Sequence, residues 1–362
     1  MNYQIKMTRP KAKLILEDGS VFEGYSFGYE TPVSGEVVFN TAMTGYPESL
    51  TDPSYKGQIL VSTYPLVGNY GVPEFLNKNG LIENFESEKI QVTAFIISGY
   101  SFDYSHWSAK KSLSDWLIEN GVPGLYGIDT RALTVKLREK GTMLGKIIFN
   151  GEDIPFYDPN SENLVRLVSV NEKTIHGKGK YKIVLVDLGV KHNIVRCLIK
   201  RNTTVIRVPW DYDFSNDDYD GLVISNGPGD PAKCKSTIEN VKKAFDSEKP
   251  VFGICMGNQI MSLAAGAETY KLTYGHRSHN QPVMNTENKK CYITSQNHGY
   301  AVDTGKLDKD WKEYFINLND GTCEGIKHRS KPFFATQFHP EASSGPTDTE
   351  FLFDEFLSLI QK

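Results

Sequence analysis

Cys255 stands where a short apolar run meets a glycine-rich turn, in the stretch Pro250-Val-Phe-Gly-Ile-Cys-Met-Gly-Asn-Gln259. Far along the chain, Gln337-Phe-His-Pro-Glu-Ala342 supplies His339 and, two residues later, Glu341. A thiol, an imidazole and a carboxylate are the minimal set for acyl transfer through a thioester, because the imidazole takes the thiol proton and the carboxylate orients the imidazole. The sequence therefore predicts Cys255 as the nucleophile, His339 as the base and Glu341 as the residue that orients the base.

The residues around Cys255 are typical of a sharp strand-to-helix turn. Gly253 and Gly257 leave room for the turn, because a Cβ at either position would approach neighbouring backbone. A side chain at such a turn is exposed at the carboxyl edge of a sheet, where α/β folds bind ligands. The amino terminus of the following helix stabilises negative charge on the sulfur. An isolated cysteine is more often an inert core residue, but the flanking glycines favour the nucleophile.

His339 follows an apolar run and precedes Pro340, which favours extended backbone. In extended chain, residues two apart point to the same side, so His339 and Glu341 can act together. The alternative is an ordinary strand end with a surface carboxylate. Paired with the cysteine turn, the motif favours the catalytic interpretation.

The loop Ser225-Asn-Gly-Pro-Gly-Asp-Pro231 follows a further apolar run and exposes backbone amides. The N–H groups of Gly229 and Met256 are our candidates for an oxyanion hole, which stabilises the charge that develops on a reacting carbonyl oxygen. The alternative is an ordinary turn, since glycine and proline are common in all loops.

A chain of 362 residues is expected to form two domains. Its formal net charge of −4 gives no support to a nucleic-acid partner, whose phosphates favour a basic surface. We find no apolar run of about 18 residues, so we expect no membrane span. The first ten residues lack the apolar core of a secretory signal.

The five cysteines are odd in number and form no Cys-x-x-Cys pair, which argues against a disulfide framework and against structural zinc. We therefore expect a cytoplasmic protein in a reducing environment. His276 and His279 are three residues apart, but two histidines without a third ligand predict hydrogen bonding in a loop rather than a metal site.

The chain reads as a strand-rich α+β domain over 1–150, a linker over 151–180 and an α/β domain over 181–362. In the first domain we expect strands at 12–16, 21–22, 37–39, 58–61 and 91–97, and helices at 108–119 and 130–139. In the second we expect strands at 182–186, 204–208, 221–225, 251–254, 291–294, 323–326 and 333–337, and helices at 193–201, 236–245 and 350–360. Alternation of strand and helix predicts an open, mostly parallel sheet flanked by helices.

The three motifs that contain Cys255, Gly229 and His339 resemble those of class I, triad-type glutamine amidotransferase domains, over residues 181–362. The first half narrows the resemblance, because four of its segments are similar to the amino-terminal domain of carbamoyl-phosphate synthase small subunits. These segments are Gly35–Tyr46, Leu50–Tyr55, Thr63–Asn69 and Gly127–Thr134. Residues 274–283 and 296–302 are also similar to segments of that family.

The resemblance implies a glutaminase subunit that hydrolyses L-glutamine to glutamate and ammonia through a thioester on Cys255. Ammonia would pass to a large synthetase subunit that makes carbamoyl phosphate from bicarbonate and ATP with Mg²⁺, in a heterodimer or a higher oligomer. This chain itself would need no cofactor, and it has no phosphate-binding loop of the Gly-x-x-x-x-Gly-Lys type. The product could serve either pyrimidine or arginine synthesis.

The family's glutamine-binding positions fall on Ser54, Gly227, Gly229, Met256, Gln259, Asn297, Gly299 and Tyr300. Gln259 lies one helical turn after Cys255, on the same face. Ser54 would come from the first domain, which would place the pocket beside the domain junction. Two positions depart from the family pattern: Asn258 replaces the usual histidine, and Ser278 replaces the usual glycine.

Two other functions remain possible from the residues alone. One is the glutaminase component of a different amidotransferase, against which the segments of the first half argue. The other is a non-catalytic scaffold with an inactive triad, against which the intact Cys255, His339 and Glu341 argue.

Overall fold

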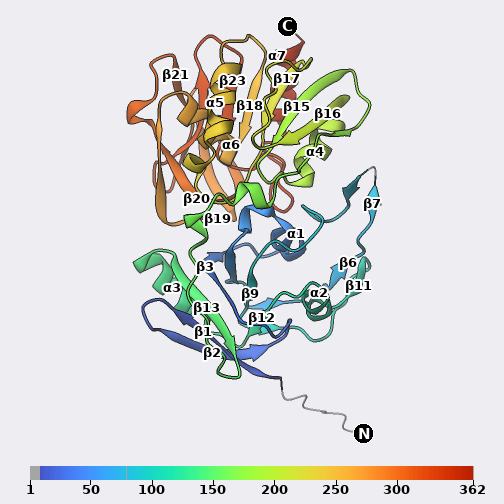
Figure 1. Cartoon of the computed structure of the whole chain (residues 1–362), viewed down its shortest axis with the longest axis vertical. Coiled ribbons are helices and arrows are strands. Elements are labelled where there is room, and N and C mark those ends of the chain that lie inside the picture. The colour runs from blue at the N-terminus through green and yellow to red at the C-terminus, as the bar shows by residue number, and fades with distance from the viewer. Residues whose placement is uncertain (1–8, 79, 362) are drawn as a thin grey trace. The chain divides into compact units, whose positions relative to one another are not determined.

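The computed structural model describes residues 9–78 and 80–361, which form two compact units (Figure 1). Unit 1 takes the chain through Thr41, then Gly57–Glu74 and Val92–Pro159. Unit 2 takes Ala42–Lys56, Phe75–Gln91 and the chain from Asn160 onward. Two stretches of the expected first domain therefore belong to unit 2.

Seven strands of unit 1 close into a barrel in the order β1-β13-β3-β4-β9-β12-β2. These strands are β1 (Lys11–Leu16), β2 (Val21–Ser26), β3 (Val33–Asn40), β4 (Gln58–Ser62), β9 (Ala94–Ile96), β12 (Gly124–Tyr126) and β13 (Met143–Phe149). Alternate residues such as Leu14, Val37, Ile59 and Ile147 are buried in one apolar core. The prediction of a strand-rich domain is confirmed, whereas closure into a barrel was not predicted, because it depends on pairings between distant strands.

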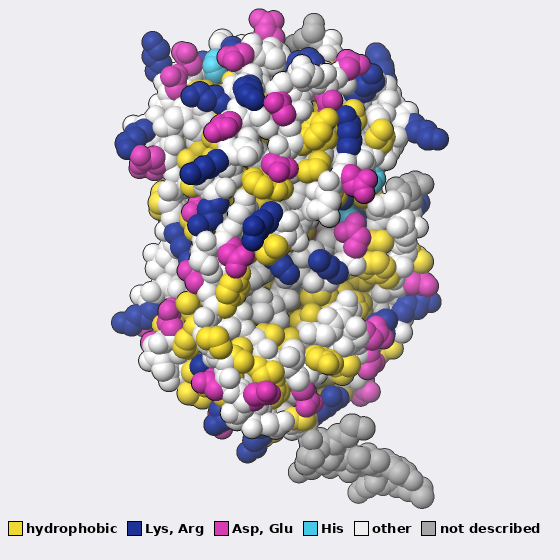
Figure 2. Space-filling model, in the orientation of Figure 1, with side chains coloured by type: hydrophobic (Ala, Val, Ile, Leu, Met, Phe, Trp, Pro, Cys, Tyr) yellow, Lys and Arg dark blue, Asp and Glu magenta, His cyan; other side chains and the backbone are white. Residues whose placement is uncertain are grey.

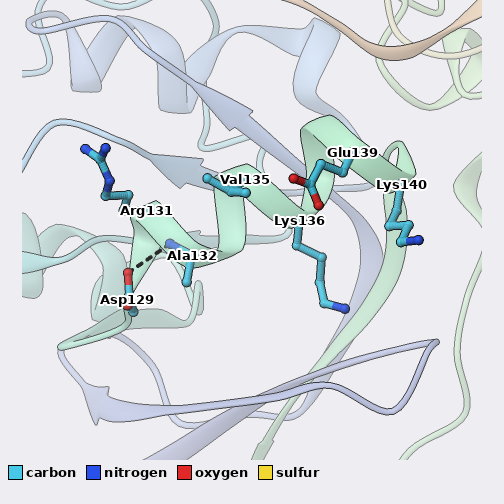
Figure 3. A pocket seen from close by; sticks show the side chains of 7 residues that line it. All are labelled: Asp129, Arg131, Ala132, Val135, Lys136, Glu139 and Lys140. Carbon is cyan, nitrogen blue, oxygen red and sulfur yellow. Dashed lines mark hydrogen bonds between the residues drawn. The ribbon is translucent and has the colours of Figure 1, made fainter.

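Helix α3 (Thr130–Lys140) packs on the barrel through Leu133 and Leu137. The side chain of Asp129 accepts a hydrogen bond from the backbone N–H of Ala132, at 2.9 Å, and caps the helix (Figure 3). A shallow pocket runs along the opposite, largely exposed face of this helix. It is lined by Asp129, Arg131, Ala132, Val135, Lys136, Glu139 and Lys140 (Figure 3). The lining of this pocket has no cysteine, serine or histidine, and it belongs to unit 1.

Helix α2 (Leu113–Glu119) begins later than the predicted 108–119, because Ser112 is its cap. The hydroxyl of Ser112 accepts from the backbone N–H of Asp115 at 3.0 Å, and the residues just before it pair as a strand. The remaining short strands of unit 1 are β5 (Leu66–Val67), β6 (Val72–Pro73), β10 (Gly99–Tyr100) and β11 (Ala109–Lys111).

Unit 2 is built on a ten-stranded sheet in the order β14-β16-β15-β17-β18-β23-β22-β20-β19-β21. Its strands are β14 (Thr174–His176), β15 (Tyr181–Asp187), β16 (Thr203–Pro209), β17 (Gly221–Ile224), β18 (Val251–Ile254), β19 (Glu268–Asn285), β20 (Cys291–Asp303), β21 (Trp311–Asn317), β22 (Cys323–His328) and β23 (Phe333–Thr336). Strands β16, β15, β17, β18 and β23 pair in parallel. The predicted α/β sheet is confirmed, with its parallel part confined to these five strands and the other pairings antiparallel.

Two apolar clusters cover the two faces of this sheet. Helices α5 (Lys235–Ala244) and α6 (Met256–Ala264) supply one cluster, and they lie in front of the parallel strands in Figure 1. Helices α4 (His192–Ile199) and α7 (Phe351–Ile360) supply the other. Residues of β15 alternate between the clusters, as expected for a strand that is buried on both faces.

The early segments of unit 2 hold α1 (Tyr46–Thr51), the 3₁₀ turn η1 (Pro53–Tyr55), β7 (Asn77–Lys78) and β8 (Leu81–Ile82). The stretch 151–180, expected to be a linker, contains the 3₁₀ turns η2 (Pro159–Ser161) and η3 (Val165–Leu167) and strand β14. Strand β14 pairs with β16 at the sheet edge, so the end of this stretch is part of the fold. The remaining 3₁₀ turns are η4 (Pro231–Lys233) and η5 (Thr304–Lys306).

Acidic and basic side chains are interspersed on the face drawn in Figure 2, with no large patch of one sign. None of the helices in the described part of the chain combines the length and the apolar character that a bilayer crossing requires.

We predict that Gly257→Ala destabilises unit 2. A Cβ at Gly257 would lie 2.1 Å from the carbonyl oxygen of Ile224, and neither backbone can yield without moving β17 or α6. The expected loss is about 2–3 kcal/mol in the free energy of unfolding, measured by urea denaturation.

The matched control is Gly305→Ala on the exposed turn η5, where the nearest neighbour is the flexible carboxylate of Asp303. We expect this control to change stability by less than about 0.5 kcal/mol. Equal stability of the two variants would contradict the close packing of β17 against the start of α6.

Candidate active site

Cys255 lies between the last residue of β18 and the first residue of α6, at the carboxyl edge of the parallel strands. Its backbone has φ 56° and ψ −104°, a conformation that side-chain-bearing residues rarely adopt. Such strain costs on the order of 1–3 kcal/mol and occurs mostly at functional sites. The strained turn is the one predicted from the glycines that flank Cys255.

The two glycines are needed for space. A Cβ at Gly253 would lie 2.6 Å from the carbonyl oxygen of Gly257, which itself packs against Ile224. Strand β17, strand β18 and helix α6 therefore approach each other as closely as backbone allows. This packing holds the Cys255 turn rigidly at the strand end.

His339 reaches Cys255 because β23 is the parallel neighbour of β18. Ile254 is opposite Thr336 in this pairing, and the N–H of Cys255 donates to the carbonyl of Thr336 at 2.8 Å. His339 follows three residues after Thr336 and is itself held by a bridge to Ser295 of β20. Strand register thus brings together residues that are far apart in sequence.

Glu341 binds the imidazole as predicted. Its Oε1 lies 2.6 Å from Nδ1 of His339, and the pair is buried. The same oxygen lies 3.1 Å from Nζ of Lys191, whose side chain also donates to the carbonyl of Ala342. The triad therefore has a fourth, cationic member that the sequence did not reveal.

The charges in this cluster support one another. Burial alone would raise the pKa of Glu341, but Lys191 and His339 lower it to about 2. Burial alone would lower the pKa of His339, but Glu341 and the Cys255 sulfur outweigh it and raise the pKa to about 10. Burial likewise opposes the charge of Lys191, yet Glu341 and the nearby Glu86 and Asp52 raise its pKa.

Nδ1 of His339 is hydrogen-bonded to Glu341, so Nε2 is the ring nitrogen that can exchange a proton with another group. Within the described residues Nε2 has no hydrogen-bond partner. The Cys255 sulfur is near enough to contribute to the raised pKa of His339. The arrangement therefore allows a proton to move from the sulfur to Nε2 and leaves a thiolate beside an imidazolium.

Two further groups contact the Cys255 sulfur. The thiol can donate to the carbonyl oxygen of Asn297, at 3.7 Å. The side-chain amide of Gln337 donates to the sulfur, at 3.8 Å. All three residues are buried, so the sulfur is shielded from bulk water.

A network of buried amides and a carboxylate surrounds the loop after β17. Asn226 accepts from the backbone N–H of Lys191 at 3.0 Å and donates to the hydroxyl of Ser54 at 2.9 Å. Asp52 accepts from the backbone N–H of Ser54 and, at 2.9 Å, from the side chain of Asn297. These contacts connect the early segment 42–56 to the strand-end loops that surround Cys255.

The predicted glutamine-binding residues lie on four elements of unit 2. Ser54 is on η1; Gly227 and Gly229 are on the loop after β17; Met256 and Gln259 are on α6; Asn297, Gly299 and Tyr300 are on β20. Contacts link Ser54 to Asn297 through Asp52, and Gln259 to the carbonyl of Tyr300 at 2.8 Å. The backbone N–H of Met256 is in the first turn of α6, where helix geometry provides no acceptor within the helix.

Ser54 was expected to come from the first domain. The structure instead places it in unit 2, because segment 42–56 returns to pack with the α/β fold. The contacts of Ser54 described above are therefore internal to one unit.

His276 and His279 take different partners. Nε2 of His276 lies 2.8 Å from Asp320, and His279 lies 3.2 Å from the hydroxyl of Ser344. Burial lowers the pKa of His279 to about 4, helped by the charges of Lys191 and His339. Both histidines are hydrogen-bonded, as predicted, but they lie in strand β19 and not in a loop.

A different trio could hold a cation. His276, His298 and Glu324 are buried and place three ligating atoms within 4.8 Å of one another. Nδ1 of His276 lies 3.5 Å from Oε1 of Glu324. Burial alone would lower the pKa of His276, but the carboxylates of Glu324 and Asp320 outweigh burial and raise it. His276 therefore lies between the carboxylates of Asp320 and Glu324, while Nδ1 of His298 lies 2.8 Å from the backbone carbonyl oxygen of Tyr300.

Sequence reasoning missed Lys191, Asp52, Asn226 and Gln337. Lys191 had one signal, a lone cation between an apolar strand and an apolar helix. Asn226 and Gln337 lie inside motifs that were singled out for their neighbours. Asp52 likewise lies in the segment Leu50–Tyr55, where only Ser54 was predicted to have a role, because the partners of Asp52 are remote in sequence.

Two family models match the chain. The model for class I glutamine amidotransferases matches residues 184–359, and the model for the carbamoyl-phosphate synthase small chain matches residues 14–147. The mouse protein "Carbamoyl-phosphate synthase [ammonia], mitochondrial" is 52% identical over 99% of this chain and 24% of its own length. The "Multifunctional protein CAD" of Squalus acanthias is 55% identical over 96% of this chain and 16% of its own length. The chain thus spans a quarter or less of these relatives.

We predict that the Glu341 carboxylate stabilises the fold in a pH-dependent way. Its pKa is depressed from 4.5 to about 2, so its contribution is present above pH 4.5 and is lost as the pH falls toward 2. Urea denaturation should show Glu341→Gln less stable than wild type by about 3 kcal/mol at pH 6. This difference should shrink steadily between pH 5 and pH 3.

Glu248→Gln is the control, because Glu248 is an exposed carboxylate. It should leave the free energy of unfolding nearly unchanged at every pH. A deficit of Glu341→Gln that stays constant from pH 6 to pH 3 would show that the charge of Glu341 is not what stabilises the site.

Proposed function

Because the chain belongs to the carbamoyl-phosphate synthase small-chain family and carries a class I glutamine amidotransferase domain, we propose that it hydrolyses L-glutamine to glutamate and ammonia. The observation that supports this most directly is the buried set Cys255, His339 and Glu341 at the carboxyl edge of the parallel strands. This set has the nucleophile, base and orienting carboxylate that amide hydrolysis through a thioester requires.

In the first step, Nε2 of His339 takes the proton of the Cys255 thiol. The sulfur attacks the side-chain amide carbon of glutamine, and the carbonyl oxygen becomes an oxyanion. We assign the N–H groups of Gly229 and Met256 to this oxygen, because the start of α6 favours negative charge. The carbon–nitrogen bond then breaks, the imidazolium protonates the nitrogen, and ammonia leaves a glutamyl thioester on Cys255.

In the second step, water attacks the thioester carbon while His339 takes a proton from the water. The carbon–sulfur bond breaks, glutamate leaves, and the proton returns to the sulfur. Glu341 holds Nδ1 of His339 throughout, at 2.6 Å, so that Nε2 faces the sulfur. Lys191 keeps Glu341 ionised in both steps.

The proposal includes a partner that consumes the ammonia. A large synthetase chain would make carbamoyl phosphate from bicarbonate and ATP with Mg²⁺, and this chain would carry no cofactor. The match of residues 14–147 to the small-chain model supports this partner over that of another amidotransferase. All five cysteines are free, which is compatible with the proposed cytoplasmic location.

A second candidate function arises from the mouse relative, whose name specifies ammonia. A chain of this kind would support carbamoyl phosphate synthesis from ammonia without hydrolysing glutamine. The presence of Cys255 with His339 and Glu341 favours the glutaminase.

The test is glutamate release by the full chain, with and without a purified synthetase chain, bicarbonate and ATP. We expect wild type to release glutamate, more rapidly with the synthetase present. Cys255→Ser should release glutamate at least 10³-fold more slowly, because an alcohol is not activated here as a thiol is.

Cys291→Ser is the matched control, since Cys291 is an exposed cysteine outside the site. It should retain the wild-type rate. Carbamoyl phosphate formation from ammonium chloride, but not from glutamine, by the wild-type complex would favour the second candidate instead.

A further inference from the structure

Gln337 is a buried side chain that the steps above do not use. It lies directly after β23, two residues before His339, and is fully inaccessible to solvent. Its amide nitrogen, Nε2, donates to the Cys255 sulfur at 3.8 Å, within the usual range for hydrogen bonds to sulfur. Gln337 therefore touches the reacting atom of the proposed glutaminase.

The orientation of the Gln337 amide follows from its neighbours. Nε2 of Gln259 donates to the backbone carbonyl of Tyr300 at 2.8 Å, so this end of Gln259 must be the NH₂ group. The same nitrogen donates to Oε1 of Gln337 at 3.2 Å. Nδ2 of Asn258 donates to this Oε1 atom as well, at 3.1 Å. With two donors on its oxygen, Gln337 must turn its own NH₂ group toward the sulfur.

The contact changes in strength when Cys255 ionises. A thiol can donate to the carbonyl oxygen of Asn297, but a thiolate has no proton to donate and gains nothing there. The NH₂ group of Gln337, in contrast, becomes a donor to a full negative charge. Hydrogen bonds to charged groups are roughly twice as strong as neutral ones, and burial increases this difference.

Asn258 is one of the two positions that depart from the family pattern, and it takes part in this network. Its Nδ2 binds Gln337, while its Oδ1 has no hydrogen-bond partner among the residues described. The side chain is fully buried beneath the turn. Asn258 thus holds Gln337 without touching the sulfur itself.

We propose that Gln337 is a further catalytic residue, whose side-chain amide stabilises the Cys255 thiolate, and that Asn258 and Gln259 are positioning residues that aim it. This inference rests on the proposed function, because it takes the Cys255 thiolate to be the nucleophile. The thiol proton moves from Sγ of Cys255 to Nε2 of His339, and Gln337 keeps both of its own amide protons. No bond to Gln337 forms or breaks.

The experiment is alkylation by iodoacetamide of the full chain at pH 7 without glutamine, followed site by site by peptide mass spectrometry. The exposed Cys291 is the internal reference, so the measured quantity is the ratio of the Cys255 rate to the Cys291 rate. Gln337→Met, which keeps the length but removes the donor, should lower this ratio about tenfold. Gln337→Glu, which places oxygen against the sulfur, should lower it at least as much.

Cys197, Cys234 and Cys323 report folding in the same samples: burial raises the pKa of each thiol to about 12, so their alkylation is slow in the folded chain and speeds up when the chain opens. If alkylation of these three cysteines shows that Gln337→Met is unfolded, the variant Asn258→Ala is measured instead. We expect it to lower the ratio of the Cys255 rate to the Cys291 rate about threefold. Gln281→Met, a glutamine on β19 that bonds Ser278, is the control and should leave the ratio unchanged.

A ratio within twofold of wild type in a folded Gln337→Met protein would overturn the proposal. Where wild type hydrolyses glutamine, the same variant should lower kcat about tenfold with KM unchanged, as expected for a group that acts on the nucleophile. Failure of the proposed function can be distinguished from failure of this inference. In that case wild type would release no glutamate, while the alkylation ratio would still report on Gln337.

Discussion

The pairing of β18 with β23 is the constraint on which the site depends. Both strands end at the same edge of the sheet, and the N–H of Cys255 is fixed by the carbonyl of Thr336. A shift of one residue in this register would turn the side chains after β23 to the opposite face. The stacked aromatic pair of Phe252 and Phe334 stabilises the register from within the core.

Charge balance is the second requirement, because a carboxylate cannot be buried alone. Glu341 is compensated on one oxygen by both His339 and Lys191, while Lys191 also receives the field of Asp52 and Glu86. The cation comes from the turn after β15 and the carboxylate from the loop after β23. The buried network therefore couples the ends of non-adjacent strands and fixes the ring of His339.

Much of this could be predicted from sequence, since local signals carried it. The glycines beside Cys255, the His-Pro-Glu motif and the apolar runs predicted the turn, the triad and the parallel strands. Strand β19 was missed because its 18 residues are mostly polar and only partly buried. The roles of Lys191 and Gln337 could not be predicted, because each depends on an atom placed by another strand.

The polypeptide passes between the units five times, the last time at Asn160, and Asp52 accepts a hydrogen bond from Asn297, 245 residues later in the chain. During synthesis on the ribosome, the segments 42–56 and 75–91 emerge long before the sheet that receives them. Closing such large loops slows folding. A single cut between residues 91 and 160 would leave two segments of unit 2 on one fragment and the rest of unit 2 on the other.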